Sequence, residues 1–480
     1  MAQQSSLKKR TLRAVLWNGV QRYGAMIISL VTNIVLARLL SPDNFGLIGL
    51  LSVFVTVASA IVDGGFGSAL IQRKEATQTD YSTVFWGNLV VSVLLVCSLY
   101  FAAPAIAGYF NQEILCKILR IESLILFINA FCIIQTVRLT KFLQFKDLAI
   151  RTIGAAIVSS IVAIVLAHAG FGVWSLVVRD ILNAATGAIL LWSLCNWKPS
   201  RVFSWESFKG LFKFGSFIFI STVSNTIYLN LQSFIIGRVF SIKDLGYYSQ
   251  AKKLESVSVE STASVLSQVL FPVYASIADN REYHRQMVRK NVRIITYLTF
   301  PLMLLLIVVA HPLLTILLTE KWAPSIPLFQ ILCIVGMMSP LNQANTEIFR
   351  AIGRSDIYLV LQTIKRLIGV IFILWSVRYG LYPMMWTIAA MSFITYFLNL
   401  VFTHRFFGYN YRQQLSDIIP NMAVTLVTGV SVWQLLHLIA LPNNWAMLFI
   451  GTGCFVLIYL GISLVARLDG PRLILNILKR

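Results

Sequence analysis

Charged side chains within apolar, helix-forming segments are the residues of this chain whose types and spacing could do chemistry. The richest segment is LGYYSQAKKLESVSVESTASVLSQVLF, residues 245–271. Within it, Lys252, Glu255 and Ser256 stand at i, i+3 and i+4, so they share one helical face, which continues to Glu260. A charge at bilayer depth costs about 2.5–3.5 kcal/mol and therefore faces a water-filled cavity or a partner. The pattern predicts either a cavity wall that meets an anionic group or a coupling cation, or a self-neutralised Lys–Glu stripe.

Other cations lie deep in the first and eleventh apolar segments. Arg22 shares a helical face with Asn18 and Gln21, which predicts a polar cavity wall or, alternatively, a cation packed against a helix carbonyl. Lys365 and Arg366 are adjacent and point about 100° apart on a helix, so we expect at most one to face a central cavity. The alternative is that both snorkel to the cytoplasmic headgroups. If one faces a cavity, a cationic cluster at this depth would bind an anionic group such as a phosphate by charge-assisted hydrogen bonds.

Acidic and amide side chains form a third group. Asp180 follows Arg179 in one segment, which predicts a buried ion pair or part of a proton or sodium relay. Asp63 opens the sequence DGGFG, whose glycines allow a helix bend or the close approach of a neighbour. A patch suited to sugar hydroxyls or to helix-to-helix hydrogen bonds comprises Asn342, Gln343, Asn345 and Glu347.

The candidate site residues fall into three sets, none of them catalytic. The candidate substrate-binding cations are Arg22, Lys252, Lys253, Lys365 and Arg366. The candidate polar cavity residues are Asn18, Gln21, Asn342, Gln343 and Asn345. The candidate ion-coupling acids are Asp63, Asp180, Glu255 and Glu260.

Signatures of metal, nucleotide and covalent chemistry are missing from the sequence. The five histidines and six cysteines are dispersed, with no CxxC pair and no ligand spacing, so we expect no metal site. No Walker loop or nucleophile with a base is recognisable, so we expect neither a cofactor nor an enzyme. Energy for any transport would then come from an ion gradient, the membrane potential or consumption of product on the far side.

The composition indicates the elements that must position these charges. Of the 480 residues, 57% are hydrophobic and only 12% are charged, and the mean hydropathy is +0.76, which predicts an all-α polytopic membrane protein. About 14 apolar runs have the length of a membrane-spanning helix. The predicted spans are 14–37, 44–70, 82–107, 115–137, 148–168, 172–194, 210–236, 245–272, 293–318, 326–349, 356–377, 381–403, 417–440 and 444–466.

The net charge of +21 is explained by membrane topology. When the loops are assigned to alternating sides, most of the 40 Lys and Arg residues fall on the side of the N-terminus. This positive-inside bias predicts that both termini are cytoplasmic. The basic charge therefore does not indicate nucleic acid as a partner.

An internal repeat predicts how the spans are arranged. ARLLSPDNFGLIGLLSVF, residues 37–54, aligns without a gap with GRVFSIKDLGYYSQAKKL, residues 237–254. A period of six spans gives two parallel, pseudo-symmetric six-helix lobes that line a central cavity. We expect lobe one at 1–194, a cytoplasmic linker at 195–209, which we interpret as a candidate interfacial helix, lobe two at 210–405, and two further helices with a basic cytoplasmic tail at 406–480.

Four motifs carry a resemblance to a known family. They are ARLLSPDNFGLIGL (37–50), DGGFGSALIQRKE (63–75), YYSQAKKLESV (247–257) and VLFPVYASIADN (269–280). Together they resemble the polysaccharide-transport branch of the multidrug/oligosaccharidyl-lipid/polysaccharide exporter superfamily, which contains the Wzx-like flippases for O-antigen and exopolysaccharides. The likeness covers residues 10–405.

The resemblance implies a bacterial inner-membrane flippase. Its two lobes would rock to move an undecaprenyl-pyrophosphate-linked oligosaccharide, such as an O-antigen or exopolysaccharide repeat unit, to the periplasmic leaflet. The expected partners are this glycan, membrane lipids and the polysaccharide polymerase machinery. Three alternatives stay open from the residues: a cation-coupled drug or small-molecule antiporter of the same superfamily, a membrane-embedded enzyme of polysaccharide assembly, and a non-transporting membrane component of that assembly.

Overall fold

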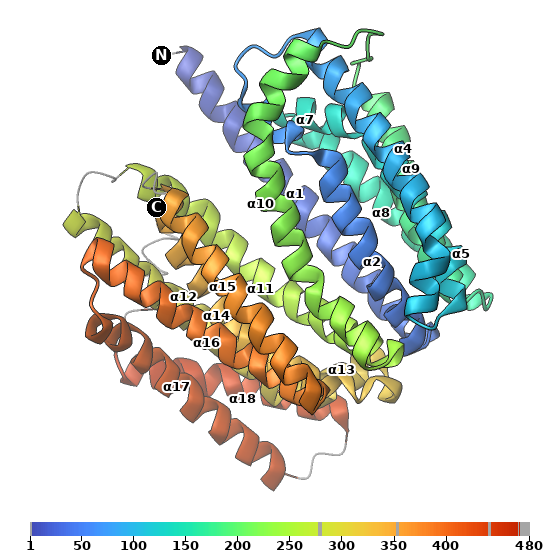
Figure 1. Cartoon of the computed structure of the whole chain (residues 1–480). Helices are drawn as coiled ribbons and strands as arrows, with labels where there is room; N and C mark the ends of the chain where they lie inside the picture. The colour runs from blue at the N-terminus through green and yellow to red at the C-terminus, as the bar shows by residue number, and fades with distance from the viewer. Residues whose placement is uncertain (1, 277–280, 352–354, 440–442, 469, 471–480) are drawn as a thin grey trace. The chain divides into compact units, whose positions relative to one another are not determined.

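The computed structural model describes residues 2–276, 281–351, 355–439, 443–468 and 470, and the regular secondary structure of these residues is entirely helical. By backbone contacts the chain divides into two units, Met1–Gly246 and Tyr247–Arg480 (Figure 1). The first unit holds α1 (Ala2–Leu39), α2 (Pro42–Asp63), α3 (Phe66–Gln72), α4 (Gln78–Tyr109), α5 (Glu113–Glu122), α6 (Leu124–Ala130), α7 (Ile133–Lys141), α8 (Phe145–His168), α9 (Val173–Leu194), α10 (Trp205–Val239) and the start of α11 (Ile242–Ser276). The second unit holds the rest of α11, α12 (Arg281–Val308), α13 (Ala310–Leu318), the 3-10 turn η1 (Glu320–Trp322), α14 (Ser325–Ala351), α15 (Ser355–Ser376), η2 (Val377–Tyr379), α16 (Leu381–Phe407), α17 (Tyr411–Leu438) and α18 (Asn444–Val465).

The helices have the length and composition of a polytopic membrane protein. Among the described residues, 11 helices are long and apolar enough to cross a membrane, or 12 if the bent segment at 113–141 is one span. The helices α10 and α11 coincide with two predicted spans, but they are not among the helices counted. Large apolar side chains such as Phe101, 78% exposed, and Val465, 86% exposed, cover the outer surfaces, as expected of helices in contact with lipid. The all-helical membrane fold is confirmed, and the number of 14 spans stays a prediction.

The repeated motif forms a helix start in both copies. In the first copy, Pro42 occupies the first turn of α2, where a missing backbone N–H costs nothing. In the second copy, the Ser241 hydroxyl accepts a hydrogen bond from the Asp244 backbone N–H at 2.9 Å, which caps α11. The repeat therefore encodes the same local structure twice, a short break followed by a new helix.

The repeated glycines bring these two helix starts together within the first unit. A Cβ on Gly46 would overlap the Ile242 carbonyl oxygen, and a Cβ on Gly246 would overlap the Pro42 carbonyl oxygen. The contact is thus reciprocal, and each glycine meets backbone atoms of the opposite helix. Glycine permits this approach because it carries no side chain.

The predicted span 44–70 is interrupted after Asp63, where the glycines were expected to allow a helix bend or the close approach of a neighbour. Gly64 and Gly65 adopt φ of 57° and 73°, a left-handed conformation that ends α2 and begins α3. A Cβ on Gly65 would overlap the Gly215 carbonyl oxygen of α10. The glycines therefore allow both the break and the close approach of a neighbouring helix.

The first part of the predicted linker, residues 195–204, is a strap held by α4, and its last residues, 205–209, begin α10. Residues 195–204 contain no helix, and α10 begins at Trp205. The Trp197 indole donates to Gln78 Oε1 at 2.6 Å, and the Trp86 indole donates to the Ser200 carbonyl at 2.9 Å. The boundary between the two units lies after this strap in the sequence, at Gly246, because α10 packs against α2, α3 and α4 of the first unit. The predicted lobe boundaries stay a prediction.

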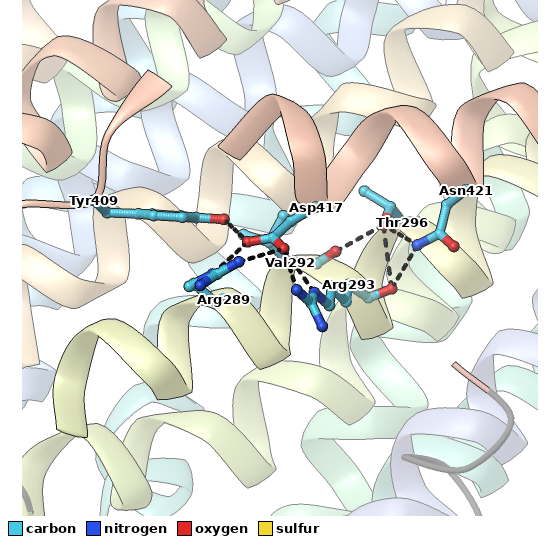
Figure 2. A network of polar contacts seen from close by, with 7 residues as sticks. All are labelled: Arg289, Val292, Arg293, Thr296, Tyr409, Asp417 and Asn421. Carbon is cyan, nitrogen blue, oxygen red and sulfur yellow. Dashed lines mark hydrogen bonds and ion pairs between the residues drawn. The ribbon is translucent and has the colours of Figure 1, made fainter. Parts of the chain in front are cut away.

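In the second unit, α12, α14 and α16 pack around an apolar core, and α17 is held against α12 by a polar network. Asp417 of α17, whose side chain is 0% exposed, lies 2.8 Å from Arg289 Nε and 2.6 Å from an Arg293 amino group (Figure 2). Tyr409 donates its hydroxyl to Asp417 at 2.7 Å, and burial and this hydrogen bond raise the pKa of Tyr409. Asn421, one turn further along α17, donates to Thr296 at 2.8 Å. The network fixes α17 to α12.

Candidate functional site

A polar pocket of about 330 Å³ lies among the apolar helices of the first unit, between α2, α5, α6, α8 and α9. Its polar lining includes Ser52, Thr56, Glu122, Asn129, Asp180 and Asn183. Buried polar side chains within a membrane-spanning bundle are costly and are retained mainly at functional positions. The pocket is therefore the candidate site of this unit.

Two carboxylates, those of Glu122 and Asp180, and the guanidinium group of Arg151 line this pocket. Asp180 accepts a hydrogen bond from Arg179 Nε at 2.8 Å, so the predicted neighbouring pair is formed. Glu122 is the last residue of α5 and only 4% exposed, and its Oε2 has no hydrogen-bond partner among the described residues. Arg151 of α8 lies against α9, where its Nε would be 3.2 Å from a Cβ on Gly187.

The predicted polar face of α1 is directed in part toward α8. Gln21 donates to Thr152 Oγ1 at 3.2 Å, and Thr152 also lines the pocket. Asn18 is half-buried, whereas Arg22 is exposed on the same helix. The face therefore combines a helix-packing contact at Gln21 with an exposed cation at Arg22.

In the second unit, the predicted charged face of α11 is directed in part into the protein. Lys252 Nζ lies 3.2 Å from the Tyr248 hydroxyl, and Glu255 is 9% exposed. Glu255 Oε1 lies 2.9 Å from the position of a Cβ on Gly336, so the carboxylate lies against α14. The ammonium of Lys252 acts electrostatically on Glu255. Lys253 is half-buried, and Glu260 is exposed.

The two units differ at matching positions of the repeat. With the gapless alignment of the motif, Ser52 matches Lys252 and Thr56 matches Ser256. The hydroxyls of Ser52 and Thr56 line the open pocket of α2. The matching face of α11 carries an ammonium beside a carboxylate. The second unit thus holds a fixed cation where the first unit presents a hydroxyl.

We expect Lys252 and Glu255 to stabilise the second unit as a pair. Lys252→Met removes the cation that neutralises a buried carboxylate and should lower the thermal stability of the purified protein. Glu255→Gln should do the same, and the double variant should recover part of the loss, with an interaction energy of about 0.5–3 kcal/mol. Thermal unfolding in detergent measures the cycle, with Glu260→Gln as the exposed control on α11. Additive losses would show that the two side chains act independently.

The amide patch of α14 contributes mainly to helix packing. Asn342 donates to the Ser392 carbonyl of α16 at 3.1 Å and accepts from Asn399 at 2.8 Å. Gln343 is exposed, and Asn345 is buried with neither side-chain polar atom hydrogen-bonded to a described residue. The side chain of Glu347 lies outside the described residues. Of the two roles predicted for this patch, binding of sugar hydroxyls or hydrogen bonding between helices, Asn342 therefore has the second.

The remaining predicted cations and acids lie at separate places. Lys365 of α15 is 7% exposed, whereas the adjacent Arg366 is half-buried. The two side chains thus differ in burial, as expected of adjacent residues that point in different directions on a helix. Asp63 accepts a hydrogen bond from the Gly65 backbone at the break between α2 and α3. Of the predicted acids in the first unit, only Asp180 lines the pocket.

Glu122 and Arg151 were not among the predicted site residues. Glu122 is the only acid in ILRIESLILF, and Arg151 ends the basic stretch that begins at Arg138. An isolated acid before an apolar run is a weak sign of a functional site. The position of Glu122 within the predicted span 115–137 could nevertheless have identified it as an intramembrane acid. The other lining groups come from segments distant in the sequence, which no spacing rule connects.

Comparison with known proteins gives consistent results over most of the chain. The family model described as "Polysaccharide biosynthesis protein" matches residues 35–327. The teichuronic acid biosynthesis protein TuaB of Bacillus subtilis is 26% identical over 432 residues, covering 88% of this chain and 89% of that protein. The succinoglycan biosynthesis transport protein ExoT of Rhizobium meliloti is 28% identical, covering 70% and 68%, and the lipopolysaccharide biosynthesis protein WzxC of Escherichia coli is 26% identical, covering 73% and 72%.

Solved structures with the same fold are membrane transporters. The lipid II flippase MurJ in an inward closed conformation superposes with a TM-score of 0.79 at 16% identity, covering 94% of this chain and 99% of that one. An inward-facing multidrug resistance transporter of the MATE family gives 0.61 at 16% identity, covering 81% and 98%. At these identities the likeness concerns the fold alone.

Proposed function

The chain belongs to the family of polysaccharide biosynthesis proteins, and from this we propose that it is a flippase for lipid-linked oligosaccharide. The substrate is an undecaprenyl-pyrophosphate-linked repeat unit of O-antigen or exopolysaccharide, which moves from the cytoplasmic to the periplasmic leaflet by alternating access. The observation that carries the proposal is the family match over residues 35–327. The curated relatives include one named as a transport protein, which supports a transport role and not an enzymatic one.

The described residues are compatible with this proposal. The apolar surfaces and the number of spanning helices place the chain in a membrane, and the proposal assigns it to the bacterial inner membrane with both termini cytoplasmic. The polar pocket of the first unit and the buried charges of α11 and α15 are the kind of intramembrane groups that transport requires. The substrate-binding roles of Lys252, Lys365 and Arg366 belong to the proposal.

Movement of lipid-linked glycan by the purified protein tests the proposal directly. The protein is reconstituted into liposomes that carry undecaprenyl-pyrophosphate-linked oligosaccharide in both leaflets, and external glycosidase digests the accessible glycan. Without flipping about half of the glycan is protected, and with flipping we expect nearly all of it to be digested. A digestion that stays at the level of protein-free liposomes would contradict the proposal. Extrusion of cationic dyes without glycan movement would favour the antiporter alternative.

A further inference from the structure

We propose that a second pocket of the first unit, beside the strap, binds the headgroup of an anionic phospholipid. This strap pocket has a volume of about 480 Å³ and is formed by residues 195–198, the ends of α7 and α9, the loop after α7 and the start of α4. The inference goes beyond the proposed function, because it concerns a lipid of the surrounding bilayer and not the transported glycan. It follows from two unpaired cations, the amides beside them and the apolar side chains next to both.

Both charged side chains that line the strap pocket are cationic. They are Arg138 of α7 and Lys198 of the strap. Neither of them forms an ion pair with a carboxylate of the described residues. A pocket with two cations and no acid in its lining attracts an anion.

The charged groups around the strap pocket leave this balance positive. Asp80 of α4 is buried and pairs with Arg73 at 3.0 Å, so these two charges cancel. Lys141 adds a positive charge, and its ammonium donates to two backbone carbonyls at 3.0 and 2.6 Å. The next charged residues along the chain are cations and acids in equal number, Lys74 and Glu75, Lys146 and Asp147, and Arg201 and Glu206. Arg138 and Lys198 therefore meet an entering anion without a competing carboxylate.

The guanidinium of Arg138 is positioned to bind a phosphate. Its Cζ lies over the rings of Tyr81 and Phe142, 5.1 Å and 5.7 Å from their centroids. Contacts with ring faces hold the guanidinium plane and leave the N–H groups, which lie in that plane, directed past the rings. Guanidinium groups bind phosphate oxygens through pairs of parallel hydrogen bonds. Arg138 is thus held in place before an anion arrives.

Further donors come from the strap and from the loop after α7. Lys198, Asn196 and Gln144 are exposed and line the strap pocket. The Gln78 amide donates to the Lys198 carbonyl at 2.8 Å and accepts from the Trp197 indole at 2.6 Å. These two hydrogen bonds fasten the backbone that carries the Lys198 ammonium and the Asn196 amide. The pocket therefore offers a guanidinium, an ammonium and amide N–H groups to one phosphate.

Apolar side chains beside these donors favour a lipid over a free phosphate. Phe142 lines the strap pocket and is 47% exposed, and the adjacent Leu143 is also exposed. Further along the strap, Val202, Phe203 and Trp205 are exposed as well. Aromatic side chains are enriched at the membrane–water interface. A ligand with an anionic headgroup and acyl chains would contact both the cations and these apolar side chains.

The strap pocket lies at an end of the first unit where such a lipid is available. Figure 1 shows α7 and the start of α10 at the same end of this unit as the N-terminus. Under the topology proposed above, this is the cytoplasmic end. Basic pockets at the cytoplasmic ends of membrane helices bind anionic lipid headgroups. A bound headgroup would connect Lys198 of the strap with Arg138 of α7 and so hold the segment that leads into α10.

Native mass spectrometry of the delipidated full-length protein tests the proposal. We expect phosphatidylglycerol to be retained more strongly than zwitterionic phosphatidylcholine. Lys198→Gln should weaken retention of phosphatidylglycerol about fivefold, since a cation near the membrane surface contributes about 1 kcal/mol. Lys209→Gln removes an exposed cation of α10 that does not line the strap pocket and should have no effect. Equal retention of the two lipids, or equal weakening in the two variants, would overturn the proposal.

Hydrogen exchange locates the bound lipid. In nanodiscs of phosphatidylcholine, inclusion of phosphatidylglycerol should slow amide exchange in residues 195–204 of the wild type. The slowing should be absent in Arg138→Gln that elutes as a single species on size exclusion, and in the exposed variant Lys198→Gln. Unchanged exchange of the strap in the wild type would show that the lipid binds elsewhere and would contradict the proposal. Slowing by inorganic phosphate alone would identify a site for a soluble anion and would equally contradict it. Neither readout requires flipping, so a failure of the proposed function leaves the lipid site standing.

Discussion

Replacing Asp417 by asparagine should destabilise the second unit by about 3–5 kcal/mol, because it leaves two guanidinium groups against a neutral side chain in a buried place. The carboxylate of Asp417 accepts hydrogen bonds from Arg289 at 2.8 and 3.1 Å and from Arg293 at 2.7 Å, while Tyr409 donates a further one at 2.7 Å. Asparagine presents one oxygen and an N–H₂ group that cannot accept any of these. We expect the thermal unfolding temperature to fall by roughly 10 °C.

Arg412→Gln provides the matched control for Asp417→Asn. Arg412 lies near the start of the same helix, but it is exposed, so its loss should change the unfolding temperature little. Limited proteolysis adds a local readout, since α17 and α18 should become cleavable between α16 and α17 in the Asp417 variant alone. If Asp417→Asn and Arg412→Gln unfold at the same temperature, the network does not hold α17 in place.

The elements formed by short segments could be predicted from the sequence. The repeated motif, the break at the glycines after Asp63 and the apolar runs each depend on residues that are close in the chain, so propensity and spacing describe them. The helical membrane fold follows from composition, because backbone polar groups within lipid must be satisfied inside each segment. The break at Gly64 and Gly65 was predictable for a simple reason: two adjacent residues with positive φ are readily supplied by glycine.

Contacts between distant residues could not be predicted in this way. The partners of Asp417 are 124 and 128 residues away, and no spacing rule connects a carboxylate of one helix with guanidinium groups of another. The lining of the first unit's pocket could not be predicted for the same reason, since it extends from Ser52 to Ala184. The sequence directed attention to Lys252 and Glu255 because a charged pair within one helix is visible as a pattern. A lone acid such as Glu122 becomes notable only when its surroundings are known.

Alanine in place of Gly246 should reduce glycan flipping at least about tenfold, a loss of about 1.4 kcal/mol or more in the rate-limiting step. A methyl group at this position would overlap the Pro42 carbonyl oxygen, and backbone atoms in a helix start cannot move aside as a side chain can. The helix starts of α2 and α11 would have to separate. Alanine also raises helix propensity by about 1 kcal/mol relative to glycine, so a loss of activity could not come from a weakened helix.

Gly453→Ala, in α18, separates this effect from glycine replacement in general, because a Cβ there would meet no atom within 4 Å. Flipping by Gly453→Ala should equal that of the wild type in the liposome assay. Gly46→Ala should resemble Gly246→Ala, since its methyl group would overlap the Ile242 carbonyl oxygen of the same contact. The double variant, with alanine at both Gly46 and Gly246, then shows whether the two glycines serve one shared contact or two separate contacts. If the first methyl group already separates the helices, the second adds little, whereas multiplicative losses would mean that the glycines act at independent places.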